Sequence, residues 1–140
     1  MRFMRFLLLI IGLFFVIHGG GSPTGQPPLH LTTFSDKQIP DQLQGCGDGY
    51  YLTAADRKTQ KNTICCSNET YAMVSVNHKT VLLLKSFQFD GYEGKGYRLT
   101  IKNGPLKTKG DEYYQMKATL TLKLGKKIIW TGELFGDGGC

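Results

Sequence analysis

Histidine is scarce in this sequence, and the familiar catalytic motifs are missing from it. Of three histidines in 140 residues, His18 directly follows an apolar N-terminal run, His30 lies in an irregular arm, and His78 falls in an expected turn, where a solvated side chain is the ordinary role. No G-x-S-x-G, H-E-x-x-H, phosphate-cradling or calcium-loop motif occurs. No C-x-x-C pair suggests a zinc site. The sequence therefore argues against an enzyme, and we expect no cofactor and no metal.

The chain also lacks an apolar run long enough to cross a membrane. Its longest such run, Leu7–Ile17, is well short of the 20 or so residues that a spanning helix needs. Arg2 and Arg5 precede this run, and small residues, Gly19–Ser22, follow it. This order is typical of a secretory signal peptide. We therefore expect residues 1–21 to be a signal peptide, the protein to be exported to the periplasm or extracellular space, and no transmembrane helix to remain after cleavage.

Charge of one sign is not strongly in excess. The formal net charge is +6, and without Arg2 and Arg5 the chain keeps 15 Lys+Arg against 11 Asp+Glu, a net charge of +4. An excess this mild does not indicate nucleic-acid binding. The expected partners are a protein or an anionic polymer of the cell envelope.

Four cysteines, Cys46, Cys65, Cys66 and Cys140, lie in the part expected to be exported. An even number in a short exported chain favours disulfides. A bond between Cys65 and Cys66 would be strained, because adjacent Cα atoms are only about 3.8 Å apart. The sequence therefore predicts a disulfide-stapled domain in which one of this pair is bonded to Cys46 and the other to Cys140.

Proline marks a change along the chain. Four of the five prolines lie in residues 22–44, which show no sustained periodicity and are interpreted as an arm or linker. Residues 45–140 are expected to form a single β domain of short strands rich in Val, Ile, Thr, Tyr and Phe. The strands predicted are Tyr71–Asn77, Thr80–Phe89, Lys95–Lys102, Ala118–Leu124 and Lys127–Phe135.

The pattern after residue 21 is that of an all-β protein. No segment shows a helical period, and Ala118–Leu124 alternates strictly, with Gly125-Lys126 as the turn of a β-hairpin. We expect about six to eight antiparallel strands in a small barrel or sandwich, which would protect the sheet edges. The pairs expected to form tight turns are Asp48-Gly49, Asp90-Gly91, Asn103-Gly104 and Asp137-Gly138.

Several segments between Tyr71 and Cys140 resemble one family. They are Val74–Lys85, Asp90–Tyr97, Lys109–Glu112 and Ala118–Leu120. Together they are similar to the small exported bacterial β-barrel inhibitors of c-type lysozyme, although the Ser before the family's first-loop Gly is absent here, where Asp90 precedes Gly91. The resemblance implies a β-barrel stapled by a disulfide, in which Cys140 is the late cysteine and Lys109 inserts into the cleft of the target.

The principal hypothesis is an exported, non-enzymatic binding protein that inhibits a hydrolase. Tyr92, Glu93 and Lys95 belong to a loop flanked by tyrosines, and Lys109 belongs to a second loop. Such loops suit contact with protein or carbohydrate. We expect these four residues to carry the binding, with the barrel as a passive scaffold.

Two alternatives use other residues. A structural or adhesive envelope module would bind an anionic polymer through a lysine-rich hairpin, and an enzyme acting on envelope carbohydrate would use Asp111, Glu112 or Glu93. Asn68 begins an N-glycosylation acceptor pattern, Asn68-Glu69-Thr70. The lysines crowding the last third of the chain are Lys102, Lys107, Lys109, Lys117, Lys123, Lys126 and Lys127.

Overall fold

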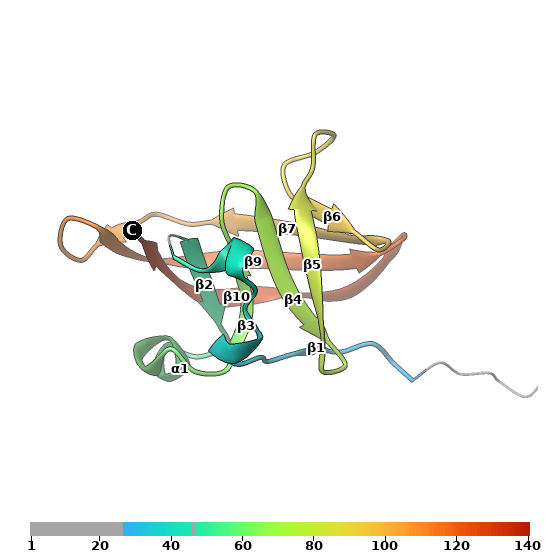
Figure 1. Cartoon of the computed structure of the whole chain (residues 1–140), viewed down its shortest axis with the longest axis horizontal. Coiled ribbons are helices and arrows are strands. Elements are labelled where there is room, and N and C mark those ends of the chain that lie inside the picture. Colours follow the sequence, from blue (N-terminus) through green and yellow to red (C-terminus); the bar gives the residue numbers. More distant parts are fainter. Residues whose placement is uncertain (1–26, 46) are drawn as a thin grey trace, which may run out of the picture.

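The fold comes from a computed structural model, which describes residues 27–45 and 47–140. The predicted signal peptide, 1–21, and Cys46 lie outside these residues. Ten strands and three short helices are present in the described part (Figure 1). In chain order they are β1 (Leu31–Thr32), 3-10 helices η1 (Asp36–Gln38) and η2 (Asp41–Leu43), β2 (Gly47–Tyr51), α1 (Ala54–Thr59), β3 (Thr63–Ser67), β4 (Tyr71–Val76), β5 (Lys79–Lys85), β6 (Tyr92–Gly94), β7 (Tyr97–Asn103), β8 (Lys107–Thr108), β9 (Tyr113–Leu124) and β10 (Lys127–Gly139).

Eight of the strands form a closed antiparallel barrel. Strands β2 to β7 pair in sequence order, β7 pairs with β9, β9 with β10, and β10 returns to pair with β2. Short strands β1 and β8 add to β4 and β9. Closure leaves no free edge on the eight strands. The prediction of an all-β, small antiparallel barrel is confirmed.

The predicted β-hairpin is also confirmed and forms the longest pairing of the barrel. Strands β9 and β10 pair from Leu124–Lys127 to Tyr113–Gly139. Ala118, Leu120 and Leu122 are buried, as their alternation predicts. Gly125 has a φ of 58°, which a two-residue hairpin turn requires and which glycine adopts without strain.

Two of the four predicted turns are wrong. Asp48-Gly49 lies within β2 and Asp137-Gly138 lies within β10. Glycine is needed there for space, because a Cβ on Gly138 would lie 2.7 Å from the Tyr114 hydroxyl oxygen. Two of the tight turns are instead formed by Asn77-His78 and Lys95-Gly96, all with positive φ.

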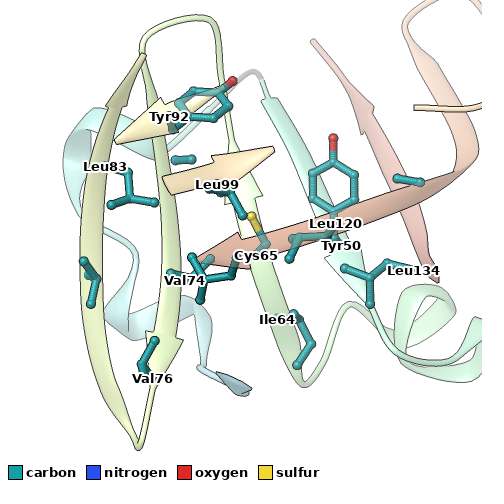
Figure 2. Packing of buried hydrophobic residues seen from close by; sticks show 14 of the residues in the cluster. Tyr50, Ile64, Cys65, Val74, Val76, Leu83, Tyr92, Leu99, Leu120 and Leu134 are labelled. Carbon is teal, nitrogen blue, oxygen red and sulfur yellow. The ribbon is translucent and has the colours of Figure 1, made fainter. Parts of the chain in front are cut away.

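The interior is filled by alternating side chains of the barrel strands. Figure 2 shows Val74, Leu99, Leu120 and Leu134 in this cluster, together with Tyr50. A second, smaller cluster lies on the other face of β3 and β4 and consists of Phe34, Leu43, Cys66 and Met73. The described part of the arm, 27–44, supplies Phe34 and Leu43 to this cluster, so that part packs against the barrel.

The predicted bonding of Cys65 and Cys66 is wrong. Both thiols are free and buried. Adjacent strand residues point to opposite faces, so Cys65 lies inside the barrel and Cys66 lies under the arm. Burial raises the pKa of the Cys66 thiol to about 12 and that of Cys65 well above its usual value. Both residues therefore act as small apolar side chains.

Candidate functional site

One end of the barrel opens into a concavity of about 930 Å³, here called the acidic mouth. It is bounded by the start of β2, the β3–β4 turn, β6, the loop before β9 and the end of β10. Among its described lining residues there is no Lys or Arg. Its acidic and aromatic lining residues are Asp48, Glu69, Asp111, Glu112, Tyr92, Tyr113 and Tyr114.

A hydrogen-bond network centres on Asp48. The Tyr114 hydroxyl donates to Asp48 Oδ1. Tyr50 is only 1% exposed, and its hydroxyl oxygen lies 3.3 Å from Asp48 Oδ2 and 3.0 Å from Asn103 Oδ1. The bond to Asp48, then burial, raises the pKa of Tyr114 to about 12. The phenol therefore stays protonated at neutral pH and fixes the Asp48 carboxylate in one orientation.

Tyr92 forms another part of the wall. Its hydroxyl donates to the Asn68 carbonyl oxygen at 2.6 Å, and its side chain is buried. Both polar atoms of the Asn68 side chain also form hydrogen bonds. Its Oδ1 accepts from the backbone N–H groups of Thr70 and Tyr71, and its Nδ2 donates to the Gln42 carbonyl oxygen at 2.8 Å. In the structure, the amide nitrogen of the glycosylation pattern therefore fastens the arm to the β3–β4 turn.

A second concavity, of about 690 Å³, lies beside the mouth on the outer surface. It shares Asp48, Glu112 and Tyr113 with the mouth. The Tyr113 hydroxyl donates to Asp137 Oδ2 at 2.8 Å. Asp137 is only 4% exposed, and burial raises the pKa of its carboxyl. Carboxylates thus flank both faces of the paired ends of β2 and β10.

The structure brings together only some of the residues predicted from the sequence. Tyr92 lines the mouth, and Lys109 stands on its rim, with its N–H donating to the Tyr113 carbonyl oxygen at 2.6 Å. Glu93 instead lies beside Arg98, with Nε and Oε2 4.0 Å apart. Lys95 is in the β6–β7 turn, near the far end of β9. The length of β9, about 35 Å, separates it from Lys109.

Of the acids proposed for catalysis, Asp111 and Glu112 line the mouth, whereas Glu93 does not. Asp48, Tyr50 and Tyr114 were missed, since Asp48-Gly49 suggested a turn. Glycine alternates with other residues in Gly45–Gly49, and Tyr50-Tyr51 follows. This pattern could have indicated a strand whose glycines leave room for bulky neighbouring side chains. Nothing in the sequence indicates that Asp48 and Tyr114, 66 residues apart, are in contact.

Comparisons with protein-family models, with curated proteins and with solved structures find no match for this chain. Within the described residues, no group of three or more His, Cys, Asp or Glu side chains is placed to hold a metal ion. No helix in the same part of the chain has the length and apolar character to cross a membrane.

Proposed function

We propose that this chain is an exported, non-enzymatic binding protein whose acidic mouth receives a cationic side chain of a basic partner protein, and that it inhibits a hydrolase in this way. One observation carries the proposal. A chain that keeps a net charge of +4 without Arg2 and Arg5 gathers four acidic side chains at one concavity, and none of the described residues lining it is Lys or Arg.

The chemistry of the mouth suits an ammonium or guanidinium group. Carboxylates accept charge-assisted hydrogen bonds from such groups, and tyrosine rings attract cations over their faces. The bonds of Tyr50 and Tyr114 to Asp48 hold one carboxylate in place before binding. A preorganised acceptor loses less conformational entropy when the partner arrives.

The acidic mouth is also relevant to the resemblance to inhibitors of c-type lysozyme. The c-type lysozymes themselves are basic enzymes. A net-positive inhibitor would repel a basic target unless its acids cluster at the contact. Asp111 and Glu112 provide such a cluster, and Lys109 lies in the same loop. In the proposed complex, Lys109 enters the cleft of the target while the acidic mouth pairs with basic residues around that cleft.

We further propose that Cys46 and Cys140 form a disulfide that staples the mouth. The last pair in the β2–β10 register is Gly47–Gly139, and each cysteine is one residue beyond it. Residues opposite each other in an antiparallel pair have Cα atoms about 4.5–5.5 Å apart, within the usual disulfide range. Since Cys65 and Cys66 are both free, Cys46 with Cys140 is the disulfide pairing left among the four cysteines.

Lysis of bacterial cells by a c-type lysozyme tests the function. We expect the purified protein to bind lysozyme in calorimetry and to inhibit lysis. A double variant of the mouth, Asp111→Asn with Glu112→Gln, is expected to bind at least tenfold more weakly. The matched control, Asp41→Asn with Glu133→Gln, removes two exposed acids elsewhere and is expected to bind like the unchanged protein.

Two outcomes would contradict the proposal. Full inhibition by the mouth variant would show that the acids do not form the contact. Absence of binding to lysozyme and also to a second basic protein, cytochrome c, would contradict recognition of cationic partners. The Lys109→Ala variant distinguishes the contribution of Lys109 from that of the acidic mouth. We expect this variant to lose more of its inhibition than of its binding.

A further inference from the structure

We propose that a second surface of this protein, the outer face of β7 and β9, binds a linear anionic polymer. A concavity of about 610 Å³ lies there, and we call it the cationic face. Its described lining includes no Asp or Glu. The lining residues are Phe89, Arg98, Thr100, Lys102, Thr119, Thr121, Lys123, Gly125 and Lys126.

The strand register places like charges against each other on this face. Arg98 is directly opposite Lys123 in the β7–β9 pairing. Like charges in directly opposed positions destabilise a sheet. An external anion bound across Arg98 and Lys123 would therefore relieve their electrostatic repulsion. Within the described part of the chain, the only ion pair of Arg98 is the 4.0 Å contact with Glu93. No residue within 27–45 and 47–140 forms an ion pair with the other three cations of this face, the exposed Lys102, Lys123 and Lys126.

The floor of the cationic face is polar. Thr100 is opposite Thr121, and the Thr121 and Thr131 hydroxyl oxygens are 3.0 Å apart. Hydroxyl groups can donate hydrogen bonds to phosphate or carboxylate oxygens. A floor of this kind favours a hydrophilic anion over a membrane surface, into which apolar side chains would insert.

The spacing of the charges favours a polymer over a small anion. Arg98 and Lys102 are four residues apart on one strand, which is about 13 Å. Charges spread over that length match a chain of anionic groups better than a single phosphate. At one margin, the Arg98 guanidinium carbon lies 5.1 Å from the centre of the Phe89 ring, which limits the orientations that Arg98 can adopt.

Two linear polyanions, one with phosphate groups and one with carboxylate groups, test the proposal. Binding of the purified protein to inorganic polyphosphate and to polygalacturonate is measured by calorimetry at several salt concentrations, with neutral dextran as the uncharged control. The test variant is Lys102→Gln with Lys123→Gln. The matched control is Lys58→Gln with Lys61→Gln, which removes two exposed lysines in and just after α1.

We expect both polyanions to bind, dextran not to bind, and affinity to fall steeply with salt because exposed charges are screened. The double variant of the cationic face is expected to bind about tenfold more weakly, and the α1 control to bind unchanged. Equal losses in both variants would overturn the proposal, as would binding that is insensitive to salt.

Binding only to vesicles of phosphatidylglycerol and phosphatidylcholine, without binding to either polymer, would also overturn it. This inference is independent of the acidic mouth, since the two surfaces have opposite charge and share no lining residue. Lysozyme binding by the Lys102→Gln, Lys123→Gln variant therefore separates failure of one proposal from failure of the other.

Discussion

At the scale of single residues, the contact between Asp48 and Tyr114 organises the acidic mouth. Tyr114→Phe removes the hydroxyl that donates to Asp48 Oδ1. We expect the free energy of unfolding, measured with urea, to fall by about 1–3 kcal/mol, since the remaining carboxylate loses a charged hydrogen bond. Tyr71→Phe is the control, because the Tyr71 hydroxyl has no hydrogen-bond partner among the residues that the structure describes. Equal stabilities of the two variants would contradict the network.

The buried Asp137 carboxyl makes stability depend on pH. Burial raises its pKa above the ordinary value of 3.8, against the lowering effects of hydrogen bonds from Tyr113 and Gln60 and of the charge on Arg57. The folded state therefore keeps this proton at a pH where the unfolded chain has released it. This contribution is fully present below the unfolded pKa and is lost as pH rises through the folded pKa.

Asp137→Asn removes that titration. In urea unfolding from below pH 3.8 to neutral pH, we expect the variant to gain stability relative to the unchanged protein as pH rises. The comparison cancels the opposite contributions of Asp56 and Asp90, whose pKa values are lowered. Parallel stability profiles for the two proteins would contradict the raised pKa.

At the scale of elements, α1 is a helix of only six residues, held by its N-cap. Thr53 Oγ1 accepts the Asp56 N–H at 3.0 Å. We expect Thr53→Ala to lower the free energy of unfolding by about 1 kcal/mol, because it leaves a helix N–H without its partner. Thr53→Ser keeps the acceptor and is expected to retain most of the stability. Loss of stability in both variants would assign the effect to packing instead.

The sequence predicted elements well where alternation was clean. The long apolar–polar alternation of Ala118–Leu124 identified the core of β9, and Gly125-Lys126 identified its turn. Helix α1 was missed because six residues are too few to show a helical period, although Thr53 with Asp56 three residues later is an N-cap signal. Strand β2 was missed because Asp48-Gly49 favours a turn locally. Its place in the sheet is decided by pairing with β10.

The candidate site was predictable only in part, for a similar reason. Tyr92, Lys109, Asp111 and Glu112 were singled out within their own loops, and each lies in the mouth or on its rim. Their grouping around Asp48 depends on closure of the barrel between β2 and β10. Contacts between segments so distant in sequence follow from the fold as a whole, which no local pattern contains.

At the scale of the whole molecule, closure of the barrel determines which disulfide can form. Strand pairing brings Gly47 opposite Gly139, while the thiols of Cys65 and Cys66 are buried on opposite faces of β3. The proposed Cys46–Cys140 bond would close a loop of about 95 residues, for which the chain-entropy model gives about 4–5 kcal/mol. This is a large share of the stability of a small domain.

We therefore expect Cys140→Ser to lower the melting temperature strongly under oxidising conditions and to have little effect in reductant, where the bond is absent. Thiol titration of the oxidised, unfolded protein should find two free thiols, those of Cys65 and Cys66. Cys66→Ser serves as the control: its melting temperature should still respond to reductant, because the stapling bond is intact. Four titratable thiols in the oxidised protein would contradict the disulfide. A Cys140→Ser variant with the same melting temperature as the unchanged protein would also contradict it, and strand pairing alone would then hold the ends of β2 and β10 together.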